Sequence, residues 1–128
     1  MNRHETILRC EDALFLVIDY QQRLVDVMPR KESVTDEITR LAQGMKRLRV
    51  PILATEQYPQ GLGPTVPPVA ELLDPAQIIA KMTFSCCGNE DFDARLKTLK
   101  RRQIVITGIE THVCVLQTVL DLLANGYQ

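Results

Sequence analysis

The chain contains 128 residues, of which 45% are hydrophobic and 24% charged, a composition typical of one globular domain and not of a disordered chain. A formal net charge of −1 gives no global field to recruit nucleic acid or an anionic membrane, and no apolar run is long enough to cross a bilayer or to form a secretory signal. The four cysteines lack the spacing of a disulfide framework or a zinc site, so we expect reduced thiols and a cytoplasmic protein.

The first predicted element is a strand over residues 13–18, ALFLVI, a continuous apolar run that suits burial on both faces. We expect residues 1–12 to form a loose arm and residues 13–128 to form one domain. Asp19 follows the strand directly, so the strand ends in an acid. Ser33 is the predicted N-cap of the next element, a helix with one apolar face. That face comprises Val34, Ile38, Leu41, Met45 and Leu48.

The middle of the chain contains a second strand and a long connection. Residues 52–55 predict the strand. Residues 56–68 are rich in proline and glycine and predict a long loop, and long loops in compact domains tend to carry function. Residues 69–73 predict a short helix.

A third, weaker strand is predicted over residues 78–80, with Lys81 immediately after it. Asn89 is the predicted N-cap of the helix that follows. The buried face of this helix comprises Phe92, Leu96 and Leu99.

The last two elements place a cysteine between a strand and a helix. Residues 104–106 are a β-branched run typical of a buried strand, Gly108 breaks that strand, and apolar residues from Val113 onward recur at helical spacing. Cys114 therefore stands where the helix begins, and the helix dipole and free amides there favour a thiolate and could hold an oxyanion. The alternative role for an isolated cysteine is purely structural, as a small hydrophobic residue buried in the core.

The alternation of strands and helices predicts an α/β fold, a three-layer α/β/α sandwich around a mostly parallel, Rossmann-like sheet. In such sheets ligands bind beyond the carboxyl ends of the strands, at the point where the strand order reverses. Asp19, Lys81 and Cys114 each follow a predicted strand, so alternation alone brings an acid, a cation and a thiol to one edge of the sheet. This convergence favours a chemical role for the cysteine.

Three motifs resemble those of the isochorismatase-like cysteine hydrolases, the superfamily that includes nicotinamidases and N-carbamoylsarcosine amidohydrolase. The motifs are VIDYQ at residues 17–21, KMTFS at 81–85 and TGIETHVCV at 107–115. The last is the most specific, because its glycine, threonine and cysteine fall at the family spacing. The resemblance extends from about residue 13 to the end of the chain.

The resemblance implies a catalytic triad of Asp19, Lys81 and Cys114. It also implies a cis peptide bond between Ile109 and Glu110, with an oxyanion hole formed by the backbone N–H groups of Glu110 and Cys114. The implied activity is hydrolysis of a small amide, carbamoyl or related carbonyl substrate through a thioester on the cysteine. The alternative is a catalytically idle member of the fold that serves as an interaction or scaffold protein.

The resemblance also narrows the substrate and the cofactors. True isochorismatases lack the cysteine, so isochorismate is not the expected substrate. Nicotinamidases hold a metal with an aspartate and histidines after the second strand, and residues 55–59, TEQYP, contain no histidine, so we expect no metal and no cofactor. Gln21, Tyr58 and Phe84 are the expected substrate-binding residues. The partner expected besides the small-molecule substrate is a second copy of the chain, in a homo-oligomer.

The sequence is also shorter than the fold it resembles. Members of the family continue past the helix that follows the cysteine into further strands, and the next strand pairs with the one over residues 104–107. That strand is too apolar for a comfortable sheet edge. We therefore expect the C-terminal strands to be missing from this chain, with either a longer protein or a partner subunit covering the edge.

Overall fold

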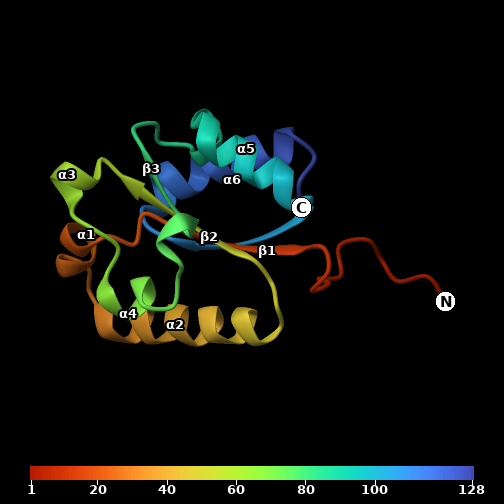
Figure 1. Cartoon of the computed structure of the whole chain (residues 1–128), viewed down its shortest axis with the longest axis horizontal. Coiled ribbons are helices and arrows are strands. Elements are labelled where there is room, and N and C mark those ends of the chain that lie inside the picture. The colour runs from red at the N-terminus through yellow and green to blue at the C-terminus, as the bar shows by residue number, and fades with distance from the viewer.

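The computed structural model describes residues 1–128, and it contains one sheet flanked by helices. The strands are β1 (Ala13–Ile18), β2 (Ile52–Gln57), β3 (Ile78–Lys81) and β4 (Gln103–Gly108). The helices are α1 (Gln22–Asp26), α2 (Lys31–Arg47), α3 (Pro59–Leu62), α4 (Pro67–Ala70), α5 (Glu90–Leu99) and α6 (Leu116–Ala124). The strands are all parallel, and α2 and α4 lie on one side of the sheet while α5 and α6 lie on the other (Figure 1). The predicted three-layer α/β fold is confirmed.

Strand β1 is the centre of both hydrophobic cores, and all six of its residues are buried. Because successive side chains of a strand point to opposite faces, Phe15 and Val17 pack in the core shared with α2 and α4. Leu14, Leu16 and Ile18 pack in the core shared with α5 and α6. The continuous apolar run in the sequence is therefore explained by a strand that is covered on both faces.

The strand order β3-β2-β1-β4 reverses direction beside β1. The chain moves outward from β1 to β2 and β3, and it then returns to place β4 on the other side of β1. The connections that follow β1 and β4 therefore lead to helices on opposite faces of the sheet, and the carboxyl ends of these two paired strands form a topological switch point, where open α/β sheets bind their ligands. Asp19 follows β1 at this point, and the turn that carries Cys114 follows β4.

Helix α2 differs from its prediction in its start and in its buried face. It begins at Lys31, so Ser33 lies in its first turn and is not the N-cap. The N-cap is Arg30, whose left-handed backbone (φ 58°) turns the chain into the helix without a capping side chain. Leu41 and Leu48 are 38% and 58% exposed, because the helix meets the sheet through a neighbouring stripe. That stripe comprises Ile38, Ala42 and Met45.

From β2 onward the elements follow the predicted order but not every predicted boundary. Residues 56–68, predicted as a loop, contain helix α3 and the start of α4, and β3 includes Lys81 as its last residue. Strand β2 continues two residues further than expected, to Gln57, which pairs with Lys81 at the end of β3. Asn89 caps α5 as predicted, because its side chain accepts a hydrogen bond of 2.9 Å from the backbone N–H of Phe92. The helix expected from Val113 instead starts with a π-helical turn over Thr111–Val115, and α6 follows that turn.

Residues 1–12 contain no helix or strand. They are fixed to the start of β4 by Gln103, whose side chain accepts a hydrogen bond from the Arg9 N–H and donates to the carbonyls of Glu5 and Ile7. Strand β4 is an edge strand, as expected, and only its start has a further backbone partner: the Ile104 N–H donates to the Gln128 carbonyl, and the Gln128 N–H donates to the Arg102 carbonyl. Beside it, α6 exposes an apolar stripe made of Leu116, Leu120 and Leu123.

Gly108 ends β4 and pairs with Ile18, the last residue of β1. Its φ of +138° is one that L side chains rarely adopt, and a Cβ atom there would lie 2.1 Å from the Ile18 carbonyl oxygen. We expect Gly108→Ala to lower the free energy of unfolding by about 3 kcal/mol or more, measured by urea denaturation. Gly44 in α2 is the matched control: nothing lies within 4 Å of its Cβ position.

Because alanine is the better helix former, Gly44→Ala should raise the free energy of unfolding by about 0.5–1 kcal/mol. Equal unfolding midpoints for the two glycine variants would contradict the close approach of β4 to β1.

Candidate active site

Asp19 is held at the switch point by its backbone and by both of its carboxylate oxygens. It is fully buried, and its N–H donates to the Thr55 carbonyl in 3.0 Å. Its Oδ1 accepts a hydrogen bond of 2.7 Å from the Thr55 hydroxyl, and its Oδ2 lies 2.8 Å from Lys81 Nζ. The carboxylate is therefore fixed in one orientation, which is the condition for a group that must accept a proton at a defined place.

Lys81 carries a buried ammonium group with four oxygen neighbours. Its side chain is 0% exposed, and Nζ lies 2.8 Å from Asp19 Oδ2 and 2.8 Å from Gln57 Oε1. The same nitrogen donates to the carbonyl oxygens of Thr83 and Phe84 at 3.0 and 2.9 Å. The loop after β3 thus supplies two of the acceptors for the Lys81 ammonium. These hydrogen bonds offset much of the free-energy cost of removing the ammonium from water.

Strand β2 braces both charged groups through side chains that the sequence did not single out. Thr55 bonds Asp19 and Gln57 bonds Lys81, and these two residues lie on the same face of β2 because they are two positions apart. The backbone of Gln57 is fixed in turn by Gln21, whose Oε1 accepts from the Gln57 N–H at 2.7 Å. The sequence contains one sign of this role: two polar residues, two positions apart, at the end of a buried strand.

Cys114 lies in the π-helical turn between β4 and α6 and is only 7% exposed. Burial raises the pKa of its thiol to about 11; the hydrogen bond and negative charge of Asp19 add to this effect, and Lys81 opposes it. The expectation of a favoured thiolate is therefore wrong for the resting site. The physical reason is that desolvation of the sulfur outweighs the attraction of one lysine, so the thiol is protonated at neutral pH.

The backbone before Cys114 offers a free donor. The peptide bond between Ile109 and Glu110 is cis, as expected. The N–H of Ile109 donates to the Ile18 carbonyl in 3.0 Å, whereas the N–H of Glu110 donates to no acceptor in the protein. A free N–H beside a thiol is the kind of group that stabilises an oxyanion. The Glu110 carboxylate itself faces outward, 3.5 Å from the ring of the exposed His112.

The expected substrate-binding residues fall into two groups. Tyr58 and Phe84 are 48% and 55% exposed, and both belong to segments that bond Lys81: the Tyr58 N–H donates to the Lys81 carbonyl, and the Phe84 carbonyl accepts from Nζ. Gln21 is fully buried, and its side-chain NH2 donates to the carbonyls of Gln57 and Gly63. Gln21 therefore holds the loop after β2 in place and presents no surface of its own.

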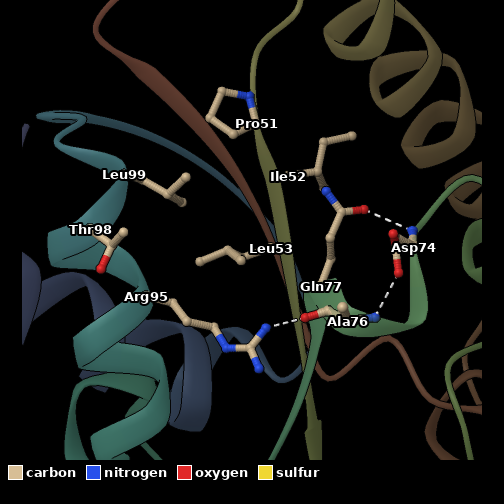
Figure 2. Close-up of a pocket in the computed structure, with 9 residues that line it drawn as sticks. All are labelled: Pro51, Ile52, Leu53, Asp74, Ala76, Gln77, Arg95, Thr98 and Leu99. Carbon is tan, nitrogen blue, oxygen red and sulfur yellow. Dashed lines mark hydrogen bonds between the residues drawn. The ribbon is translucent and has the colours of Figure 1, made fainter.

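A separate pocket of about 290 Å³ lies between the start of β2 and one side of α5, away from the carboxyl ends of the strands (Figure 2). Its polar groups already have partners: the Arg95 guanidinium donates to the Ala76 carbonyl and to Asp91, and Asp74 accepts from the Ala76 N–H. None of Asp19, Lys81 or Cys114 lines it. No group of three His, Cys, Asp or Glu side chains is arranged to hold a metal ion.

A parallel α/β sandwich with an acid, a lysine and a cysteine at its switch point is the arrangement expected of the isochorismatase-like hydrolases. The chain belongs to the isochorismatase family, because residues 13–128 match the isochorismatase domain.

The curated relatives include isochorismatase family protein 1A of Dictyostelium discoideum, which is 37% identical over 119 residues, covering 90% of this chain and 58% of that protein. The chain therefore spans less than two thirds of the length of this relative. None of the helices described above is long and apolar enough to pass through a membrane.

Solved structures share the fold closely. The MAR1 ribonuclease of Caenorhabditis elegans is 34% identical with a TM-score of 0.86, covering 94% of this chain and 62% of that one. YcaC of Pseudomonas aeruginosa, solved with hexane-2,5-diol and covalent acrylamide, is 27% identical with a TM-score of 0.91, covering 99% and 65%. YcaC of Escherichia coli, an octameric hydrolase of unknown specificity, is 25% identical with a TM-score of 0.90, covering 100% and 64%.

Proposed function

We propose that this chain acts as a cysteine-dependent hydrolase of a small amide, carbamoyl or related carbonyl compound, with Asp19, Lys81 and Cys114 as its catalytic triad. The observation that carries the proposal is the fully buried ion pair between Asp19 and Lys81 beside a nearly buried thiol. Burying two charges is expensive, and hydrophobic residues of the same volume would stabilise a core at least as well. A chain that retains such a pair next to a nucleophile is therefore more readily explained by chemistry than by stability.

In the proposed acylation step, Cys114 Sγ attacks the substrate carbonyl carbon while the Asp19 carboxylate accepts the thiol proton. A general base is needed because the raised pKa of Cys114 leaves little thiolate at neutral pH. The C–N bond then breaks, and the leaving nitrogen takes the proton from Asp19. The products of this step are an amine or ammonia and a thioester on the cysteine.

The second half-reaction uses the same groups. A water molecule loses a proton to Asp19 and attacks the thioester carbonyl, the C–S bond breaks, and the departing sulfur takes the proton back. Lys81 stays bonded to the carboxylate and fixes its direction throughout. The N–H groups of Glu110 and Cys114 are proposed to receive the oxyanion of both tetrahedral intermediates, where each such donor is worth about 3–4 kcal/mol in the transition state.

Tyr58 and Phe84 are the proposed substrate-binding side chains, since their backbones bond Lys81 while their rings remain partly exposed. An aromatic rim of this kind favours a small substrate with an apolar portion next to the carbonyl. Gln21 takes the supporting role described above.

The decisive experiment is a screen of small amides and carbamoyl compounds for release of amine or ammonia. We expect Cys114→Ala to abolish the turnover of any substrate found, because the other thiol near the ion pair, Cys86, is fully buried and lies 3.7 Å from the Thr55 hydroxyl. Cys10→Ala is the matched control, since this cysteine is exposed in the N-terminal arm and should be replaceable without effect. Full turnover by the Cys114 variant would overturn the proposed triad.

The idle-scaffold alternative predicts a different result: no turnover in the screen, and no faster capture of Cys114 by acrylamide than of a small free thiol with a similar pKa. Ribonuclease activity is not favoured by this chain, although three structural relatives carry the name MAR1 ribonuclease, two of them as putative. A formal net charge of −1 gives the chain no net positive charge to attract a phosphate backbone.

We propose that the protein is a homo-oligomer. Two observations support this: the exposed stripe of Leu116, Leu120 and Leu123 on α6, and the octameric assembly of the E. coli relative. Light scattering of the purified protein at several concentrations tests it, with a concentration-independent monomer as the contrary result.

A further inference from the structure

Thr118 is a buried hydroxyl on α6 with two hydrogen-bond partners from different parts of the chain. It is 0% exposed, and its Oγ1 donates to the Cys114 carbonyl at 2.6 Å. The same oxygen accepts a hydrogen bond of 3.0 Å from the backbone N–H of Cys86. Threonine and serine often bond the carbonyl four residues earlier in a helix, but that habit alone does not require a second partner from a distant loop.

The loop that reaches Thr118 is the one that holds Lys81. Lys81 Nζ donates to the carbonyls of Thr83 and Phe84, and the N–H of Cys86 then donates to Thr118. No other hydrogen bond joins residues 82–89 to the segment that runs from Glu110 through α6. The Thr118 hydroxyl therefore connects the loop that binds the Lys81 ammonium to the turn that contains Cys114.

We infer that Thr118 is a positioning residue that sets the distance and direction of Cys114 relative to the Asp19–Lys81 pair. Asp19 is fixed by β1 and β2, and Lys81 by β3 and its loop, whereas Cys114 arrives on a separate turn after β4. Catalytic groups from separate segments lose about 100-fold in rate when one of them is misplaced by roughly 1 Å. This inference rests on the proposed function, because it needs the thiol and the carboxylate to act together.

The test compares Thr118→Val, which keeps the shape and removes the hydroxyl, with Thr118→Ser, which keeps the hydroxyl. We expect the valine variant to lower kcat by about 10- to 100-fold with little change in KM, and the serine variant to stay within about threefold of the wild type. Ile38→Val is the control for a buried truncation, because Ile38 of α2 lies in the core on the other face of the sheet from Cys114. It should destabilise the protein and leave kcat unchanged.

A second readout does not require a substrate. Hydrogen exchange of the Cys86 amide should be faster in Thr118→Val than in Thr118→Ser, and capture of Cys114 by acrylamide should change its pH dependence in the valine variant only. A Thr118→Val variant with the kcat and exchange of the Ile38 control would overturn the inference while leaving the triad intact. A wild-type protein without turnover or enhanced capture would instead overturn the proposed function, and this inference with it.

Discussion

Replacing Lys81 with methionine is expected to lower the free energy of unfolding by about 3–5 kcal/mol and to abolish turnover. The side chains of Lys81 and Asp19 are 0% and 1% exposed, and their charged atoms lie 2.8 Å apart. Methionine fills a similar volume but leaves a buried carboxylate without its cation, and the Gln57 side chain and two loop carbonyls lose their donor. Urea denaturation followed by circular dichroism measures the loss of stability.

The control is Lys97→Met, which removes a lysine from an ion pair of 2.6 Å with Asp93 on the exposed face of α5. Solvent and salt screen exposed pairs, so this variant should unfold near the wild-type midpoint. A second variant separates charge from packing: adding Asp19→Asn to Lys81→Met removes the unpaired charge and should recover part of the lost stability. Equal losses in Lys81→Met and Lys97→Met would show that burial of the pair contributes nothing.

The three candidate catalytic residues could be found in the sequence because each lies at the end of a strand or in the turn that follows it. An apolar run that ends in Asp19, another that ends at Lys81, and a strand–glycine–cysteine sequence around Cys114 are all local signals. Parallel topology then brings them together without any knowledge of side-chain packing. The fold class was predictable for the same reason, since a doubly covered strand such as β1 is readable from six consecutive apolar residues.

The supporting residues could not be found this way, because their roles depend on register and on packing between distant segments. Thr55 and Gln57 reach the charged groups only because β2 lies between β1 and β3 and extends to Gln57. Gln21 lies two residues after Asp19, a position equally suited to a substrate-binding residue. Only the structure shows that its side chain is buried and bonds the loop after β2. Thr118 carried one weak signal, a polar residue on the apolar face of its helix.

The protonation state of the Cys114 thiol could not be predicted from the sequence either. A cysteine at the start of a helix is expected to be acidified by the helix dipole. Here a π-helical turn over Thr111–Val115 precedes α6, and the sulfur of Cys114 is packed in the core shared with Leu16 and Leu122. The pKa of the thiol depends on how deeply the sulfur is buried relative to the charges around it. The pattern of apolar residues in the sequence does not give that depth.

Asp19→Asn is expected to separate thiol acidity from catalysis. The Asp19 carboxylate raises the pKa of Cys114, so its neutral amide should lower that pKa from about 11 and increase the thiolate fraction at pH 8. Turnover should nevertheless fall by about 10²–10⁴-fold, because the amide cannot accept the thiol proton or return it to the leaving group. The two measurements are the pH dependence of acrylamide capture and kcat/KM on a confirmed substrate.

The sign of the pH effect follows from the direction of the shift. In the wild type the thiol stays protonated until the pH approaches about 11, so the capture rate should keep rising across the whole alkaline range. In Asp19→Asn the same rise should occur at lower pH. Asp121→Asn removes an equal charge from the exposed side of α6 and should leave the Cys114 profile unchanged. A capture profile that moved to higher pH in Asp19→Asn would show that the carboxylate does not raise the pKa of Cys114. Full turnover by Asp19→Asn would show that Asp19 is not the general base. In either case the proposed acylation step would have to begin from a thiolate stabilised by Lys81.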